Sequence, residues 1–293
     1  MKKIALYARP TTDNHPEYLK LLVRKLSGTS VELTIHDKYY QWLKQNHDDI
    51  PELNVFKSES DFAEKAQMLI SLGGDGTMLE TLKFVKDSGI PVLGVNTGRL
   101  GFLASVAKNE FDEAIEKIVN DKFELDKRSV IKVESDTKLF GGLNYALNEV
   151  TIHKKDSSAM ISIDAHVDGE FLNSYWADGL IISTATGSTA YSLSCGGPIM
   201  IPGSGNFCIT PIAPHNLNVR PVVIGNNHTL ELSVKGRSAE FLLTLDSRNA
   251  TINKSSILTL SRADFTFNLI KLDGQSFFNT LRNKLLWGID KRN

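Results

Sequence analysis

Hydrophobic and polar positions follow two different patterns along the chain, and the change falls near residue 126. Before it, short apolar runs typical of buried strands alternate with stretches in which apolar residues recur at the i, i+3, i+4, i+7 spacing of amphipathic helices. The apolar runs are residues 3–8, 31–36, 68–72 and 91–95, and the helical stretches are 19–26, 60–67, 78–85 and 109–120. Residues 37–57 have weak periodicity, which predicts a variable connection with one short helix. The alternation predicts a parallel, doubly wound α/β domain over residues 1–125.

After residue 126 the chain consists mainly of short segments that are rich in β-branched residues or alternate between apolar and polar side chains. Val167-Asp-Gly-Glu170 is a strong signal for a hairpin with a two-residue turn. The segments are residues 129–135, 143–153, 160–167, 170–176, 180–183, 229–234, 239–245, 257–261 and 264–271. They predict an all-β, sandwich-like domain over residues 126–272. Apolar residues at helical spacing from Phe277 to Leu285 then predict a C-terminal helix, within residues 273–293, that returns to the first domain.

Composition restricts the classes of protein to which the chain can belong. The 293 residues carry 33 basic and 34 acidic side chains, so the basic excess of a typical nucleic-acid binder is missing. Two cysteines without a C-x-x-C pair argue against a disulfide framework or a zinc cluster. No apolar stretch approaches membrane-spanning length, and the run before Arg9-Pro10 is too short for a secretion signal. We therefore expect a cytoplasmic protein that binds neither nucleic acid nor membranes.

The segment Gly73-Gly-Asp-Gly76 follows one apolar run and directly precedes a helical stretch. Glycines allow a phosphate to approach the backbone closely, and a helix that begins there directs its free N–H groups at the same place. Helix capping by Asp75 is the alternative interpretation, but a cap needs one flexible neighbour and not three. The turn therefore predicts a phosphate-binding site that contains an acid. It lies at the carboxyl end of a parallel strand, where such folds bind ligands, and residues 96–102 lie at a second such end.

A turn rich in Ser, Thr and Gly at residues 183–192 follows a buried run and leads into a short helical stretch. Hydroxyls and free N–H groups at such a helix start are suited to bind a ribose, an amide or a phosphate. Capping explains any one of these hydroxyls, but their number exceeds what a cap needs. A nucleophilic serine is not indicated, because the G-x-S-x-G sequence of a nucleophile elbow is missing.

Other polar positions are less informative. Asn148-Glu149 interrupts an apolar β segment, which fits either a solvated edge or a binding position. The seven histidines have no H-x-x-x-H spacing, so no dedicated metal site is predicted.

Together, Gly73-Gly-Asp-Gly76, Asn148-Glu149, Asp178-Gly179 and Thr186-Gly-Ser-Thr-Ala-Tyr191 resemble the signature of the NAD kinases. The resemblance runs from about residue 68 to 287 and includes Asn96-x-Gly98-x-x-Gly-Phe-Leu103, Gly196-Gly-Pro198 and Pro211-Ile-Ala-Pro-His215. A GGDG turn alone also occurs in diacylglycerol and sphingosine kinases and in 6-phosphofructokinases, so the 186–191 segment is the more specific part. The resemblance implies transfer of the γ-phosphoryl group of ATP to the 2′-hydroxyl of the adenosine ribose of NAD, which gives NADP.

The resemblance also implies roles for individual residues. Asp75 is the catalytic acid-base residue. An ordinary Asp carboxylate is ionised but a weak base, so we expect Asp75 to orient the hydroxyl and to accept its proton late. The β-rich domain binds NAD, with Glu149 close to the ribose hydroxyls and Tyr191 as an aromatic wall. The residues implied in nucleotide binding are Asp75, Gly76, Asn148, Glu149, Trp176, Asp178, Thr186, Thr189, Ala190, Tyr191, Ser192, Leu193, Ser194, Ala213 and Arg248.

Three positions depart from the family pattern. Many members have Gly and then Gln after the Asp of a late strand, whereas this chain has Asp246-Ser247-Arg248, so Arg248 would have to reach a phosphate or carboxamide. Trp176 and Ala159 stand where other members often have polar or basic residues. The implied partners are NAD and ATP, a divalent metal, Mg²⁺, that is bound with ATP, and a second copy of the chain in a dimer or tetramer.

Two other functions stay open at this point. A lipid kinase of the same superfamily would need an apolar groove, which the hydroxyl-rich turn disfavours. A non-catalytic NAD(P) sensor would not need an acid beside the 2′-hydroxyl. The sequence does not decide between ATP and polyphosphate as donor, between NAD and NADH as acceptor, or whether NADP or NADPH inhibits.

Overall fold

The structure is a computed structural model that describes residues 2–10, 16–98, 101–155 and 160–288, so Ala159 lies outside the described residues. The chain forms two compact units, one of Met1–Lys127 with Phe267–Asn293 and one of Arg128–Thr266. We call them the α/β unit and the β unit. The predicted boundaries at 125/126 and 272/273 differ from this division mainly at strand β17 (Ile257–Lys271), whose residues belong to both units.

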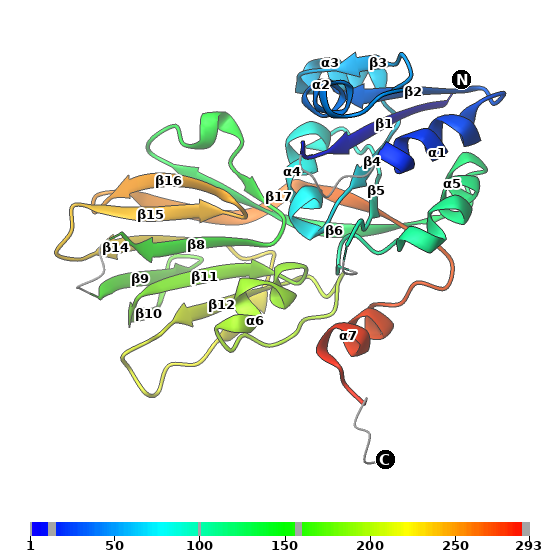
Figure 1. Cartoon of the computed structure of the whole chain (residues 1–293). Helices are drawn as coiled ribbons and strands as arrows, with labels where there is room; N and C mark the ends of the chain where they lie inside the picture. Colours follow the sequence, from blue (N-terminus) through cyan, green and yellow to red (C-terminus); the bar gives the residue numbers. More distant parts are fainter. Residues whose placement is uncertain (1, 11–15, 99–100, 156–159, 289–293) are drawn as a thin grey trace. The chain divides into compact units, whose positions relative to one another are not determined.

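The α/β unit contains a parallel sheet with the strand order β3-β2-β1-β4-β5, and the last part of β17 pairs in parallel with β5 (Figure 1). Its strands are β1 (Lys2–Ala8), β2 (Val31–His36), β3 (Asn54–Phe56), β4 (Met68–Leu72) and β5 (Val92–Val95). Its helices are α1 (Pro16–Leu26), α2 (Asp37–Asn46), α3 (Glu59–Lys65), α4 (Asp75–Val85), α5 (Phe111–Val119), which follows the 3₁₀ turn η1 (Lys108–Glu110), and α7 (Phe277–Leu285).

Helices cover both faces of this sheet. Ile4 and Leu6 of β1 belong to a core cluster with α1, α2 and α5. Tyr7, which points to the opposite face, contacts the Phe84 ring of α4, and that ring also contacts Phe62 of α3. The predicted doubly wound α/β architecture is therefore confirmed.

The variable connection predicted for residues 37–57 is more regular than the sequence indicates. It contains the ten-residue helix α2 and the edge strand β3. The helix buries Tyr39, Tyr40 and Leu43. Two adjacent aromatic residues among charged ones produce a weak apolar period, which explains why the pattern understates this helix.

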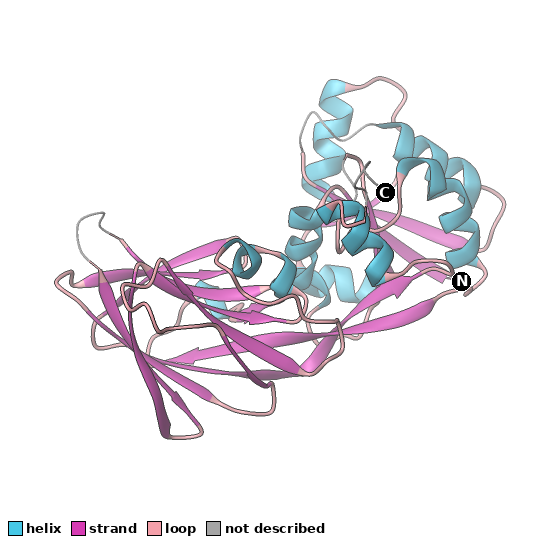
Figure 2. Ribbon diagram, turned by 90° about the horizontal axis from the view of Figure 1, so that it is seen from below, coloured by secondary structure: helices cyan, strands magenta, loops and turns pink. Residues whose placement is uncertain are grey.

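The β unit consists of two sheets that enclose one apolar core, and Figure 2 shows the two layers. One sheet has the order β10-β9-β14-β17, with β6 paired to β17 and β7 paired to β6, and the other has the order β13-β12-β11-β8-β15-β16. The strands are β6 (Glu124–Ser135), β7 (Tyr145–Ala146), β8 (Glu149–Lys154), β9 (Ile161–Val167), β10 (Glu170–Ala177), β11 (Gly179–Thr184), β12 (Asn206–Ile212), β13 (Val222–Gly225), β14 (Leu230–Lys235), β15 (Glu240–Leu245), β16 (Arg248–Asn253) and β17. The sandwich-like prediction is confirmed, as is the hairpin at Val167-Asp-Gly-Glu170.

Three strands of the β unit lack a clear signal in the sequence. β16 lies at a sheet edge, where five of its six residues stay partly or fully exposed and only Ile252 is buried. β13 has four residues, and β12 contains Pro211. The two segments predicted at 257–261 and 264–271 form one continuous strand, β17. In the described part of the chain, no helix is long and apolar enough to cross a membrane.

Candidate active site

Asp75 is the first residue of α4, and the main chain of a neighbouring loop holds its carboxylate. Oδ2 accepts a hydrogen bond from the N–H of Phe102 (2.8 Å), and Oδ1 accepts those of Leu103 and Ala104 (2.9 Å each). Each carboxylate oxygen accepts about two hydrogen bonds. Counting donors from the described residues alone, Oδ1 is therefore saturated, whereas Oδ2 has capacity for one further donor.

The loop that donates these hydrogen bonds is itself tied to the sheet. Main-chain hydrogen bonds join Asn96 to Val106 (2.8 Å) and Val106 to Gly94 (3.1 Å). Its Phe102 ring contacts Phe277 of α7, with 6.2 Å between ring centroids. A Cβ atom on Gly101 would lie 1.9 Å from Oδ1 of Asp75. Only glycine at this position allows the loop and the carboxylate to approach so closely.

Arg9 lies beside the glycine turn, at the carboxyl end of β1. Its Nη2 atom donates to the carbonyl of Gly76 (2.9 Å) and pairs with Oε1 of Glu80 (2.8 Å). The hydroxyl of Tyr7 donates to Oε2 of the same glutamate. The α/β unit thus places a guanidinium, a carboxylate with one remaining acceptor position and the start of α4 around one turn.

In the β unit, Asn148 and Glu149 stand at the start of β8, and their main-chain N–H groups are held by one side chain. Asp246 accepts the N–H groups of Leu147, Asn148 and Glu149 at 2.9, 2.8 and 3.1 Å. Within the described residues, Asn148 Oδ1 and Glu149 Oε2 are buried without a hydrogen-bond partner. Unpaired buried acceptors are unfavourable, and a ligand with suitable donors would relieve that cost.

Burial raises the pKa of the Glu149 carboxyl to about 8, and the nearby carboxyl of Asp246 contributes in the same direction. A buried glutamate that changes charge near neutral pH is typical of functional sites. The alternative of a solvated edge at Asn148-Glu149 is therefore wrong, because Asn148 is only 8% exposed.

The hydroxyl-rich turn packs directly on Asn148. Thr184 donates its hydroxyl to the carbonyl of Leu147 (2.6 Å) and accepts from the N–H of Gly187 (3.1 Å). A Cβ atom on Gly187 would lie 2.1 Å from the carbonyl oxygen of Asn148, so this approach also requires glycine. The buried guanidinium of Arg128 donates to the hydroxyl of Thr186 (3.2 Å).

A second group of predicted residues lies at the other end of β11. Asp178 pairs with Lys154 (2.6 Å), Trp176 is 53% exposed on β10, and Ala213 follows β12 with a φ of 45°. In the register, Gly179 pairs with His153 and Ser183 with Glu149. Four residues at ~3.3 Å each separate the two ends by about 13 Å. Burial raises the pKa of the Tyr191 hydroxyl, and the charges of Cys195, Asp178 and Glu149 act in the same direction.

The remaining predicted residues lie on or next to the short helix that follows the turn, α6 (Tyr191–Ser194). Thr189 ends the 3₁₀ turn η3 (Gly187–Thr189), and Ala190 joins it to α6. Tyr191 is 41% exposed, whereas Ser192 is buried and shares a hydrogen bond with Thr210 (2.9 Å). Leu193 and Ser194 complete the helix. The predicted residues from Thr186 to Ser194 therefore form the turn and helix after β11, whereas the other predicted residues of the β unit come from different elements: Asn148, Glu149, Trp176, Asp178, Ala213 and Arg248.

Arg248 is engaged with its own unit. Its guanidinium donates to the carbonyls of Leu143 and Tyr145 and lies 5.8 Å from the ring centre of Phe140. A direct contact between Arg248 and a nucleotide stays a prediction.

Two features of the site were not predicted. The role of Asp246 had a signal in the sequence, an acid directly after an alternating strand, but its three donors lie 97 to 99 residues away. The main-chain amides of residues 102–104 had no signal in the sequence, because a main-chain N–H donor does not depend on the residue type. The one indication in this loop is Gly101, directly before them, which the close approach to Asp75 requires.

Comparison with known proteins identifies the family. The family model of the ATP-NAD kinase N-terminal domain matches residues 4–123, and that of the C-terminal domain matches residues 147–272. The NAD kinase of Cytophaga hutchinsonii is 42% identical over 290 residues, with 99% of each chain covered. The NAD kinase of Flavobacterium psychrophilum is 43% identical over 293 residues and covers 99% of this chain and 100% of its own.

Solved structures agree in fold. The crystal structure of yeast NADH kinase complexed with NADH has a TM-score of 0.88 at 20% identity, with 99% of this chain and 89% of that chain covered. The structure of an NAD kinase from Archaeoglobus fulgidus in complex with ATP has a TM-score of 0.75 at 24% identity, with 97% and 98% covered. The resemblance predicted from the sequence motifs is confirmed: the chain belongs to the ATP-NAD kinase family.

Proposed function

We propose that this chain transfers the γ-phosphoryl group of ATP to the 2′-hydroxyl of the adenosine ribose of NAD and so produces NADP. The observation that carries the proposal is whole-length identity of 42–43% to proteins named NAD kinase. Each unit offers one supporting feature: a carboxylate at a glycine turn in the α/β unit, and in the β unit two buried acceptors that lack a hydrogen-bond partner among the described residues. Neither a lipid kinase nor a sensor accounts for both features.

Asp75 would act through Oδ2. This oxygen has one acceptor position left after its bond to Phe102, so it can accept a hydrogen bond from the 2′-hydroxyl and later its proton. The three amides fix the orientation of the carboxylate before substrate binds. Orientation of the nucleophile is a large part of the rate enhancement in phosphoryl transfer. The reaction then forms the bond between the hydroxyl oxygen and the γ-phosphorus, and the bond from that phosphorus to ADP breaks.

The β unit would bind NAD. Glu149 Oε2 and Asn148 Oδ1 are the unpaired acceptors for ribose and adenine donors. Tyr191 offers an aromatic face, and Asp178 and the residues around it offer polar contacts about 13 Å along β11. We extend the same proposal to Gly76, Trp176, Thr186, Thr189, Ala190, Ser192, Leu193, Ser194 and Ala213.

We propose that Mg²⁺ enters with ATP. Among the described residues, no three His, Cys, Asp or Glu side chains come together as a metal site, and Asp75 already accepts three amides. These residues fit a metal that the nucleotide phosphates and water hold, which is common for Mg²⁺. When bound, it neutralises charge on the phosphates, and Arg9 lies where it can add to that effect.

We also propose that the chain acts in the cytoplasm and as a homo-oligomer, a dimer or a tetramer. Sedimentation of the purified protein measures the second point.

Incubation of the purified protein with ATP, Mg²⁺ and NAD should yield NADP, detected with an NADP-specific dehydrogenase. Parallel reactions with polyphosphate as donor and NADH as acceptor decide the substrate choice. The absence of NADP from the reaction with ATP and NAD, together with the absence of NADP or NADPH from the parallel reactions, would refute the proposed function.

The affinity for NAD should rise with pH through about 8 and level off above it. Burial raises the pKa of Glu149 to about 8, so the carboxyl carries a proton below that pH, and a protonated carboxyl accepts fewer ribose donors than a carboxylate. If only the ionised form binds NAD well, KM for NAD increases about fivefold between pH 8 and pH 7. Glu149→Gln should abolish this pH dependence, and an unchanged profile in that variant contradicts the assignment.

A further inference from the structure

The main chain at Asn148-Glu149 is held more completely than strand pairing requires. Asp246 accepts all three N–H groups of residues 147–149. The carbonyls of Leu147 and Asn148 accept from the hydroxyl and the N–H of Thr184 (2.6 and 2.9 Å), and that of Glu149 accepts from the N–H of Asp246 (3.0 Å). Two residues, Asp246 and Thr184, therefore satisfy all six main-chain groups of this segment.

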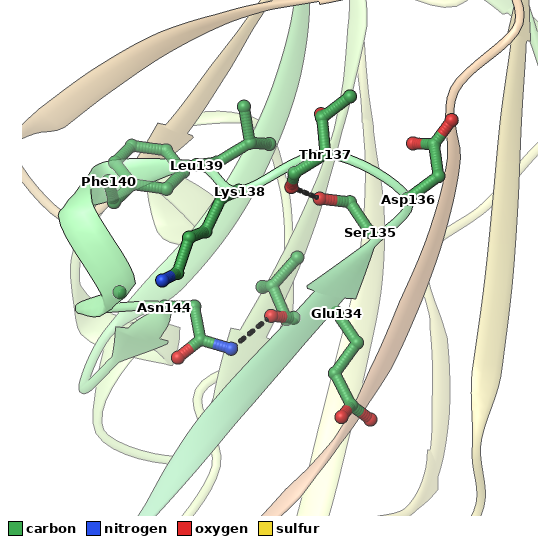
Figure 3. Close-up of a pocket in the computed structure, with 10 residues that line it drawn as sticks. Glu134, Ser135, Asp136, Thr137, Lys138, Leu139, Phe140 and Asn144 are labelled. Carbon is green, nitrogen blue, oxygen red and sulfur yellow. Dashed lines mark hydrogen bonds between the residues drawn. The ribbon is translucent and has the colours of Figure 1, made fainter.

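The residues just before this segment are held from the same hairpin. Arg248 stands two positions after Asp246, and its guanidinium donates to the carbonyls of Leu143 and Tyr145. Figure 3 shows the intervening Asn144, whose side chain donates to the carbonyl of Val133 (2.6 Å) beside a pocket lined by residues 133–140, 142 and 144. The loop that leads into Asn148 is thus fixed at 143, 144 and 145.

The hairpin turn between β15 and β16 makes this possible. Leu245 and Arg248 pair across a two-residue turn in which Asp246 has a φ of 51°. Asp is one of the few residues that adopt this left-handed conformation readily. The turn directs its carboxylate and the following guanidinium at two successive parts of one segment.

We propose that Asp246 and Arg248 are positioning residues. From one turn they fix the main chain of residues 143–149 so that the side-chain oxygens of Asn148 and Glu149 are presented to the nucleotide in one orientation. The inference rests on the proposed function in one respect, that the nucleotide binds at Asn148 and Glu149. Arg248 in this role acts through the segment and does not need to touch the nucleotide.

The test compares Arg248→Met, Arg248→Lys and Asp246→Asn with Asn249→Ala. The last variant is a matched control, because it removes the hydrogen bond between Thr244 and Asn249 (2.9 Å) in the same hairpin without touching residues 143–149. The measurements are kcat and KM for NAD and for ATP, the thermal midpoint, and amide hydrogen exchange of residues 143–149 without nucleotide.

Arg248→Met should lower kcat/KM for NAD about 10- to 100-fold, leave KM for ATP within about twofold, and accelerate exchange of the 147–149 amides. Arg248→Lys should be intermediate, since an ammonium group donates but lacks the planar fork. Asp246→Asn should resemble Arg248→Met, and Asn249→Ala should match the wild type. Should Asp246→Asn fail to fold, the two Arg248 variants still decide the matter.

Wild-type kcat/KM for NAD in Arg248→Met with only a lowered thermal midpoint would show a merely structural role and overturn the proposal. Exchange that stays slow in Arg248→Met without nucleotide would also overturn it and would leave direct nucleotide contact as the reason for lost activity. If the wild type forms no NADP, the proposed function is refuted. The positioning role is then tested by amide hydrogen exchange of residues 143–149 alone.

Discussion

Replacement of Asp75 by Asn should lower kcat for NADP formation about 100- to 10,000-fold, while the Kd for NAD changes less than about threefold. The amide keeps the shape of the side chain but cannot take the proton of the 2′-hydroxyl. It also places an NH₂ group against at least one of the N–H donors of residues 102–104. Both effects act on the reacting groups, whereas most of the proposed NAD contacts belong to other residues.

Turnover and NAD binding must be measured separately in this variant, by a coupled assay and by calorimetry. Asp87→Asn is the charge-matched control, since Asp87 is an exposed carboxylate just beyond the end of the same helix. It should retain wild-type values. Near-normal turnover in Asp75→Asn would remove Asp75 from the mechanism.

Gly101→Ala should lower kcat about 10- to 100-fold although it leaves the carboxylate itself in place. The new methyl group would lie 1.9 Å from Oδ1 of Asp75, so either the carboxylate or the loop has to move. The same overpacking should destabilise the protein by about 1–3 kcal/mol. A displacement of about 1 Å at a nucleophile-orienting group is sufficient for a loss of this size.

Gly98→Ala is the control for the Gly101 variant. It lies in the same loop, but the nearest atom to its added Cβ is 3.9 Å away, so little change is expected. Equal losses of kcat in both glycine variants would indicate that the loop tolerates no side chain for a reason other than the contact with the Asp75 carboxylate. A Gly101→Ala enzyme with wild-type kcat would show that the contact between loop and carboxylate is dispensable.

The parts of the fold that the sequence predicts well are those with strong local signals. β4, the glycine turn and α4 lie where the apolar run, the glycines and the helical spacing place them. β2 is found at Val31–His36, as predicted. Buried central strands and amphipathic helices have one dominant period, so a single sequence suffices to locate them.

Edge strands, whose residues are mostly exposed to solvent, are harder to predict from the sequence. β16 is an edge strand with the sequence Arg248-Asn-Ala-Thr-Ile-Asn253, which reads as a polar connection. It pairs with β15 because the turn at Asp246 directs it there, and not because of its own apolar content. The same turn contributes the contacts that hold Asn148 and Glu149.

The site was predictable where side chains carry the chemistry and not where the main chain does. Asp75, Asn148 and Glu149 follow from the motifs. Their surroundings depend on contacts between distant segments, such as Asp246 with residues 147–149 and Asp75 with residues 102–104. Such contacts require a folded chain, and a single sequence offers no residue pattern that specifies them.

We propose above all that Asp75 directs a phosphoryl group to the 2′-hydroxyl of NAD. The most direct measurement is ³¹P NMR of the product that the wild-type protein forms from NAD, ATP and Mg²⁺, with Asp75→Asn in parallel. We predict one ADP for each NAD consumed, with the new phosphate on the 2′-oxygen of the adenosine ribose, and no such product from the variant. A phosphate on any other hydroxyl, free phosphate alone, or equal product from Asp75→Asn would contradict it.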